Sequence, residues 1–302
     1  MKNKNTELSN TILRANTISS KNWLQAVNIL EKAAEDYPQE AVIYLTLGDI
    51  FLRQKQYEQA LSSFQKAQLI DPDDEHLKFV IGNCYLSLGE YQMALQKYKE
   101  IKMESPELTY NLALVYAYSN QHSESLEQLN KLIETIPENL NLHYFIVEEL
   151  LRLHKYDEAL EWLNKLERQF GIQRYQQILM GFIWTFKKIW LKAFTSFKNA
   201  DDMYPITNPD HMQSYATACR EIGQLDKAIE ILKKAIRVNP FVSLLSEELI
   251  RIYLHKKDFT AAESVITEAF KNLGKSNPIL LLLKEKLDKM VYEETHNDDS
   301  NE

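Results

Sequence analysis

The side chains that could perform chemistry in this chain are scattered rather than grouped. Two cysteines, Cys84 and Cys219, lie far apart, with no CxxC motif or Cys/His cluster of zinc-site spacing. The seven histidines form no ligand spacing such as HExxH. The adjacent acids at 148–149 and 247–248 would point to different faces of a helix, so we expect solvated charge there. No Gly-rich phosphate loop or Ser/His/Asp arrangement appears, so we expect a protein that is not an enzyme and uses no cofactor or metal.

The charge balance disfavours two classes of partner. The 302-residue chain has a net charge of −8, and its basic residues are spread among acids without an Arg/Lys stripe. Phosphate contacts to nucleic acid and a polybasic membrane patch are therefore not expected. The longest apolar run, 279–283, is too short for membrane insertion, and the polar N-terminus lacks a secretory h-region. We expect a cytoplasmic protein.

One small residue recurs along the chain at a nearly constant interval. The intervals are 34, 34, 31, 34, 34, 35 and 34 residues, and the positions are Ala26, Ala60, Ala94, Ser125, Ala159, Ala193, Ala228 and Ala262. Such a period predicts eight copies of one unit in which two helices meet closely at the small residue. The cysteines fall at interior positions of the first helices, where they would serve as small buried hydrophobes.

Other columns keep the same phase. An apolar residue follows each small residue by four positions, and a Pro or Gly follows it by twelve. The second unit shows the fullest pattern, with Tyr44, Leu47, Gly48, Phe51, Ala60, Phe64, Ala67 and Pro72. The sixth unit is similar, with Met180, Gly181, Trp184, Ala193, Phe197, Ala200 and Pro205. Four units depart at the Gly position, which we expect to weaken those units without changing the phase.

This pattern resembles the tetratricopeptide repeat, a 34-residue helix–turn–helix unit. The resemblance implies an all-α fold, a right-handed α-solenoid of eight such units plus a C-terminal capping helix. We expect a disordered N-terminus at 1–6, repeats over 7–276, the cap at 277–292 and an acidic disordered tail at 293–302. The 31-residue interval places the three missing residues in the turn and first helical turn of the fourth unit, about 106–139, where we expect a short junction. Pro106 holds the position of the proline that ends the second helix in other units.

The resemblance also implies that the first helices of the units line a concave groove. The positions expected to face it in units three to six include eight aromatic residues and two asparagines: Phe79, Asn83, Tyr110, Asn111, Tyr118, Tyr144, Phe145, Tyr175, Phe182 and Phe186. Aromatic rings dominate binding hot spots, and Asn amides can hydrogen-bond a peptide backbone. Packing between neighbouring first helices is the alternative role for any one ring.

We therefore expect a non-catalytic adaptor or scaffold that binds an extended or helical segment of a partner protein in this groove. Asn83 and Asn111 fall at the two Asn positions of the clamp with which related cochaperones hold a chaperone C-terminal tail. Phe79, Asn141 and Phe145 occupy the positions where that clamp needs cations, so a chaperone tail is not the expected ligand. The alternative is a structural assembly factor, or a self-associating scaffold, acting through its ends or convex face.

Overall fold

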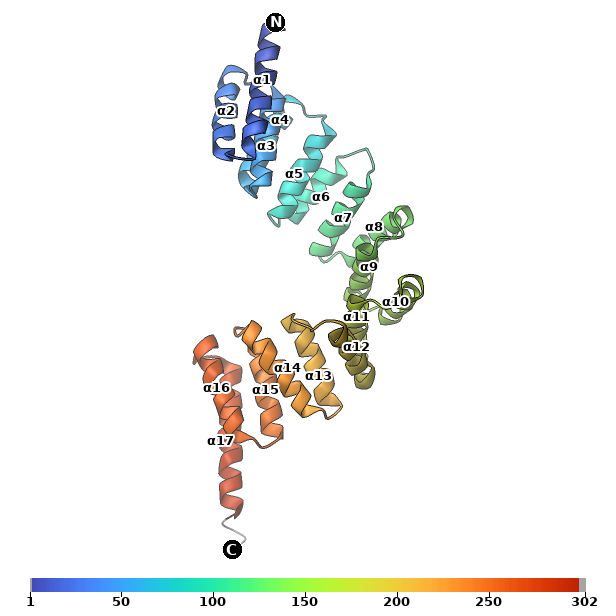
Figure 1. Cartoon of the computed structure of the whole chain (residues 1–302), viewed down its shortest axis with the longest axis vertical. Coiled ribbons are helices and arrows are strands. Elements are labelled where there is room, and N and C mark those ends of the chain that lie inside the picture. The colour runs from blue at the N-terminus through green and yellow to red at the C-terminus, as the bar shows by residue number, and fades with distance from the viewer. Residues whose placement is uncertain (1, 299–302) are drawn as a thin grey trace. The chain divides into compact units, whose positions relative to one another are not determined.

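The computed structural model describes residues 2–298 and contains seventeen helices and no strand over that range (Figure 1). The expected all-α solenoid of helical repeats is confirmed. The helices form two compact units, 1–153 and 154–302. The first unit contains α1 (Lys2–Ser19), α2 (Trp23–Asp36), α3 (Ala41–Arg53), α4 (Tyr57–Ile70), α5 (Glu75–Ser87), α6 (Tyr91–Lys99), α7 (Pro106–Tyr118), α8 (His122–Thr135) and α9 (Leu140–Arg152).

The second compact unit repeats the same organisation. It contains α10 (Tyr156–Phe170), α11 (Arg174–Phe186), α12 (Trp190–Met203), α13 (Pro209–Glu221), α14 (Leu225–Val238), α15 (Ser243–His255), α16 (Phe259–Leu273) and α17 (Pro278–Asp298). Helices pack in consecutive pairs, α1 with α2 through α7 with α8 and α11 with α12 through α15 with α16. Within each compact unit, every second helix also packs on the first helix of the next pair, which gives a continuous core.

The column of small residues lies at the closest approach of paired helices. All eight of its members are completely buried. In three units a glycine on the first helix faces an aromatic ring on the second. A Cβ added to Gly48 would lie 2.4 Å from Phe64, and one added to Gly82 would lie 2.4 Å from Tyr98. The same addition at Gly181 would reach 2.7 Å from Phe197. Glycine is therefore required wherever the facing residue is aromatic.

The units that depart from glycine carry smaller facing residues. Ala113, Ala216 and Ile250 replace the glycine, and the corresponding positions on the second helix are Leu129, Leu232 and Ile266. All six side chains are completely buried. An aliphatic side chain at the facing position leaves the room that an aromatic ring would fill, so these three residues fit where glycine stands in other units.

The turns inside the units share one backbone conformation. In seven of them the residue five positions before the small residue has a positive φ, and only two of the seven are glycines; the residues are Lys55, Gly89, Asn120, His154, Lys188, Gly223 and Lys257. The first unit differs, since Lys21 is not among the positive-φ residues and Ala15 rather than Arg14 is its buried residue on α1. Ala15 of the first unit therefore takes the place that Gly48 has in the second unit.

The 31-residue interval has a different origin from the one expected. Helix α6 has 9 residues, whereas α4 has 14, and the connection that follows α6 has two more residues than the one that follows α4. Pro106 does not end the third unit; it is the first residue of α7, and Ser105 caps that helix by accepting from the Leu108 N–H. The longer connection is fastened by Glu75, whose carboxylate accepts the N–H groups of Lys102 and Met103 at 3.0 and 3.1 Å.

Both ends of the described chain are more helical than expected. Residues 2–6, expected to be disordered, belong to α1. Helix α17 begins as expected at Asn277 and Pro278, with the Asn277 Oδ1 accepting the N–H groups of Ile279 and Leu280. It buries Leu280, Leu283 and Leu287 but continues to Asp298, beyond the expected end of the cap at 292. Residue 1 and residues 299–302 of the expected tail lie outside the described range.

Candidate protein-binding surface

The ten residues expected to line a groove divide between the two compact units. Helices α5, α7 and α9 of the first unit carry seven of them, and α11 of the second unit carries Tyr175, Phe182 and Phe186. We call the exposed side of α5, α7 and α9 the first-helix surface. Four residues define it: Asn83, Tyr110, Asn111 and Phe145. Each compact unit presents its own set of side chains.

A hydrogen-bonded network joins three side chains of the first-helix surface. The Asn83 Oδ1 accepts a bond from the Tyr98 hydroxyl at 2.6 Å and from the Asn111 Nδ2 at 2.8 Å. Tyr98 comes from α6, so the network ties α5 to both α6 and α7. Burial raises the pKa of the Tyr98 hydroxyl, so this hydroxyl stays protonated and can donate.

The network fixes the two asparagines while leaving part of each amide unused. The Asn83 Nδ2 and the Asn111 Oδ1 make no hydrogen bond to another described residue. They offer one donor group and one acceptor, which is what a peptide unit requires. The expected role of the asparagines toward a peptide backbone is thus compatible with their internal hydrogen bonds.

The aromatic residues near the network differ in accessibility. Tyr110 is 42 % exposed and its ring meets Phe145 edge-on, with 6.2 Å between the ring centroids. Phe79 is half-buried and packs 6.0 Å from Tyr98. Tyr144 is only 9 % exposed, and burial raises its pKa. Tyr144 is therefore a packing residue, in contrast to its expected place in the groove, whereas Tyr110 and Phe145 can contact a ligand.

Two exposed rings stack on tyrosines that sequence reasoning did not select. Tyr118, at the end of α7, stacks on Tyr91 with 5.4 Å between the centroids, and Phe186, at the end of α11, stacks on Tyr156 at the same separation. Tyr118 and Phe186 are each 56 % exposed. Tyr91 and Tyr156 both stand three residues before the small residue, at the start of a second helix. The sequence did carry a signal for Tyr91 and Tyr156. The residue three positions before the small residue contacts the end of the first helix of the following unit.

The remaining two residues of α11 belong mainly to the core of the second unit. Tyr175 and Phe182 are half-buried and pack against its buried cluster. Phe182 meets Phe197 and His211 edge-on, at centroid separations of 5.6 and 5.3 Å. Burial lowers the pKa of His211, which favours its neutral form in this contact. Phe186 is thus the expected groove residue of α11 that is open to solvent.

A buried polar cluster lies between α8 and α9. The Glu149 carboxylate is 3.1 Å from the His122 Nδ1, and Glu149 is 3 % exposed. Burial raises the pKa of Glu149, and the contact with His122 opposes that shift. Ser125 also faces this carboxylate, although its hydroxyl makes no hydrogen bond of good geometry. Solvated charge was the wrong interpretation of Glu149, and also of Glu247, which is buried as well.

The groups in this cluster and the two cysteines do not form an accessible reaction centre. Ser125 is completely buried, so a substrate cannot reach its hydroxyl. Cys84 and Cys219 are buried, as expected, and burial raises the pKa of each thiol to about 12. A thiol with that pKa is a poor nucleophile at neutral pH. Across residues 2–298, no group of His, Cys, Asp and Glu is arranged to hold a metal ion.

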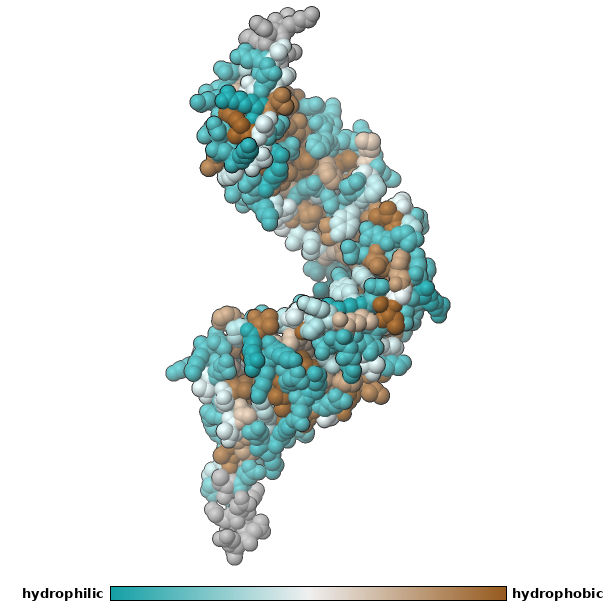
Figure 2. Space-filling model, viewed as in Figure 1, coloured by the Kyte–Doolittle hydropathy of each residue, from teal (hydrophilic) through white to brown (hydrophobic). Residues whose placement is uncertain are grey.

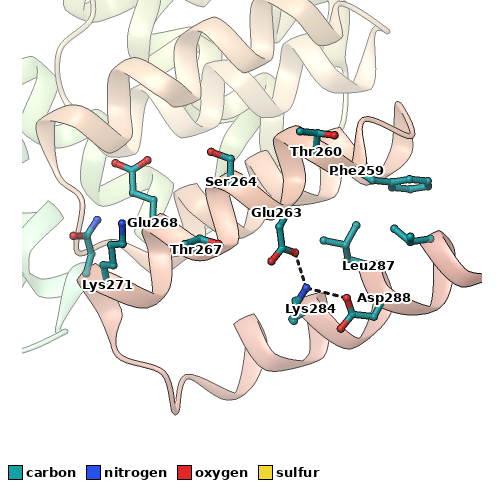
Figure 3. A pocket seen from close by; sticks show the side chains of 12 residues that line it. Phe259, Thr260, Glu263, Ser264, Thr267, Glu268, Lys271, Lys284, Leu287 and Asp288 are labelled. Carbon is teal, nitrogen blue, oxygen red and sulfur yellow. Dashed lines mark hydrogen bonds and ion pairs between the residues drawn. The ribbon is translucent and has the colours of Figure 1, made fainter.

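A cavity of about 980 Å³ lies between α16 and α17 (Figure 3). At its centre the Lys284 Nζ binds Glu263 at 2.6 Å and Asp288 at 2.9 Å. Lys284 stands at the position that glycine occupies in α3, α5 and α11. A lysine there would prevent the close approach of another second helix. The side of α17 that carries Lys284 is therefore polar, unlike the closely packed glycine positions of the other helices.

The surface and the helices give no sign of a membrane span. None of the helices described for this chain is long and apolar enough to cross a bilayer. Figure 2 shows a mostly hydrophilic face on which hydrophobic residues form small separate areas. On this face, apolar contacts would be made by particular side chains rather than by a broad apolar area.

Family models place the repeats independently in each compact unit. Models described as tetratricopeptide repeat match residues 18–84 and 216–273. The chain is a tetratricopeptide repeat protein. Repeats of this family generally mediate protein–protein interaction. No curated protein sequence matches the chain.

Solved structures share the fold of this tetratricopeptide repeat protein at low sequence identity. A tetratricopeptide repeat protein from Parabacteroides merdae superposes with a TM-score of 0.61 at 16 % identity, covering 82 % of this chain and 99 % of that one. The C-terminal part of a repeat protein from Cytophaga hutchinsonii gives 0.57 at 15 % identity, covering 77 % and 96 %. A chain of the APC/C hetero-tetramer Cut9–Hcn1 gives 0.57 at 15 % identity, with 92 % of this chain matched to 55 % of that one.

Proposed function

We propose that this tetratricopeptide repeat protein is a non-catalytic adaptor that binds a segment of a partner protein on the first-helix surface. The observation that carries the proposal is the combination of the exposed Tyr110 ring and the half-buried Phe145 ring with two fixed amides that each keep one hydrogen-bonding group unused. The rings supply apolar contact area, and Tyr110 adds a hydroxyl. The amides supply the donor and acceptor that a backbone needs.

The fixed geometry of the amides also supports this proposal. Asn83 and Asn111 are already held by bonds to each other and to Tyr98, so little side-chain entropy remains to be lost when a ligand binds. The edge-to-face contact similarly orients Tyr110 and Phe145 before binding. A preorganised surface of this kind is expected to select an extended or helical segment by its backbone and by one apolar side chain.

The test compares proteins that co-purify with the wild-type chain and with a Tyr110→Ala/Phe145→Ala variant, identified by mass spectrometry. Tyr144 is excluded from the variant because its truncation would leave a cavity and destabilise the fold. The matched control is Tyr204→Ala/Phe241→Ala, which removes two exposed rings, 66 % and 69 % accessible, from loops of the second unit.

We expect at least one partner to be lost from the first variant and retained by the control, with circular dichroism unchanged in both. Retention of every partner by Tyr110→Ala/Phe145→Ala would show that this surface is not the binding site. Light scattering over a range of concentrations separates this function from self-association, for which the mass would rise with concentration.

A further inference from the structure

A second cavity, of about 600 Å³, lies between first helices of the second compact unit. Its walls come from α13, α15 and α17, and the start of α14 contributes Leu225. We call it the C-terminal cavity. It lies in a different compact unit from the first-helix surface and shares no residue with it. Its chemistry is therefore independent of the proposed adaptor site.

Cationic side chains are concentrated in the C-terminal cavity of an acidic chain. Four of its lining residues are Arg or Lys, namely Arg220, Arg251, Lys257 and Lys286, and Glu221 is the one lining acid. The net charge of the whole chain is −8. Acids elsewhere on the chain are screened at distances beyond the Debye length of about 8 Å at physiological ionic strength. A ligand in the cavity therefore responds mainly to the lining charges and to the acids in direct contact with them.

Two of the four cations are already neutralised within the protein. The Arg220 guanidinium lies between two carboxylates, 3.0 Å from Glu221 and 2.7 Å from Glu248. Its contact with Glu248 is an ion pair without the alignment of a hydrogen bond. The Lys257 Nζ lies 3.3 Å from the Glu294 carboxylate.

The other two cations remain available. Arg251 and Lys286 are exposed and have no ion-pair partner in the described part of the chain. His255 lies four residues after Arg251 on the same face of α15 and adds a ring nitrogen to the same wall. Arg251 and Lys286 thus approach the cavity from two different helices, α15 and α17.

The cavity also contains apolar side chains, which distinguishes it from a simple charged patch. Ile252 is buried, and Leu225 and Met290 are half-buried. The exposed apolar surface of Leu225 and Met290 would remain hydrated under a purely ionic ligand. A ligand that carries both carboxylates and an apolar side chain satisfies the cations and covers this surface.

We propose that the C-terminal cavity binds an acidic segment of a partner protein, with carboxylates at Arg251 and Lys286 and an apolar side chain against Leu225 and Met290. The guanidinium of Arg251 forms bidentate bonds with a carboxylate, and the ammonium of Lys286 binds a second one as a point charge. The adaptor thereby has two recognition surfaces of different chemistry, one aromatic and uncharged, the other cationic.

Fluorescence anisotropy with a defined peptide tests this inference on the full-length chain. The probe is a short fluorescein-labelled peptide of alternating glutamate and aspartate with one central leucine. We expect saturable binding that weakens as salt is added. An Arg251→Glu/Lys286→Glu variant should bind about tenfold more weakly or worse, since two attractions become repulsions. Replacing the leucine of the probe by glycine should weaken binding several-fold.

The matched control is Arg237→Glu/Lys275→Glu, which changes the net charge of the chain equally at two exposed cations outside the cavity. Equal weakening by this control, or unchanged binding by Arg251→Glu/Lys286→Glu, would overturn the proposal. So would displacement of the peptide by a single-stranded oligonucleotide of the same charge as effectively as by unlabelled peptide, because the ligand class would then be wrong. Tyr110→Ala/Phe145→Ala should leave the affinity for the probe unchanged.

Discussion

The contact between Gly48 and Phe64 allows a sharp test of how paired helices are matched. In Gly48→Ala, the new Cβ would lie 2.4, 2.6 and 2.6 Å from three atoms of the Phe64 ring. Carbon atoms in contact normally lie about 3.5–4.0 Å apart. Phe64 is completely buried, so its ring has no free space into which it can retreat.

Two opposing effects determine the outcome of Gly48→Ala. Alanine stabilises a helix interior by about 1 kcal/mol relative to glycine. Overpacking a filled core costs about 1–3 kcal/mol, and contacts this short favour the upper part of that range. We therefore expect a net loss of about 1–2 kcal/mol in the free energy of unfolding.

A second substitution should reverse the effect. Phe64→Leu alone costs about 1–2 kcal/mol, because it removes buried contacts and leaves a partial cavity. Together with Gly48→Ala it recreates the Ala–Leu combinations of Ala113 with Leu129 and Ala216 with Leu232. We expect the double variant to be more stable than the sum of the single changes by about 1–3 kcal/mol.

Urea unfolding of the full chain, followed by circular dichroism, measures all four corners of this cycle. The control is Ala216→Gly, which should lose about 1 kcal/mol of helix propensity. If Gly48→Ala gained about 1 kcal/mol, or if the two changes added within about 0.5 kcal/mol, the steric argument would be refuted.

Three further predictions use other parts of the structure. Lys257 has a φ of 57°, a left-handed conformation that is unfavourable for lysine but not for glycine. Lys257→Gly should therefore raise the free energy of unfolding by up to about 1 kcal/mol in urea titrations. A decrease would show that the lysine conformation is not strained. Burial raises the pKa of Glu149 above 4.5, so the folded state binds a proton more tightly than the unfolded state. The wild type should therefore lose stability relative to Glu149→Gln as pH rises from about 4.5 through that raised pKa. If the difference in stability between the two proteins, measured by thermal unfolding, did not change with pH, the pKa of Glu149 would not be raised. Cys84 and Cys219 should resist a thiol reagent at pH 8 until denaturant is added, and rapid labelling of the folded chain would contradict their burial.

The helix pairs could be predicted from sequence because the small-residue column marks a local contact between neighbouring helices. The turn before α7 could not be assigned from Pro106 alone, since proline is common both after one helix and at the first position of the next. Ser105 was the distinguishing signal, because a serine directly before the proline is a favourable N-cap. No single residue of α6 explains why this helix is shorter than the other second helices.

The candidate site was less predictable because accessibility depends on neighbouring helices. Tyr144 and Phe145 are adjacent in sequence, yet the first is buried and the second is half-buried beside Tyr110. Glu149 had a visible signal, since the preceding helix α8 carries His122 and Ser125 where most other units place an aromatic ring and an alanine. Two polar substitutions in the same unit indicated a buried polar group.

The matched residues also define which pieces of this chain are interchangeable. Gly48 and Phe64 lie within one helix pair, and so do Gly181 and Phe197. A duplication or deletion that begins between α4 and α5 therefore transfers a compatible pair intact. A deletion of α4 to α7 would instead set Gly48 opposite Leu129 and leave a void, and a duplication of the same segment would set Ala113 opposite Phe64 and cause a clash. The unit of gene duplication compatible with this core is the complete helix pair, never a single helix.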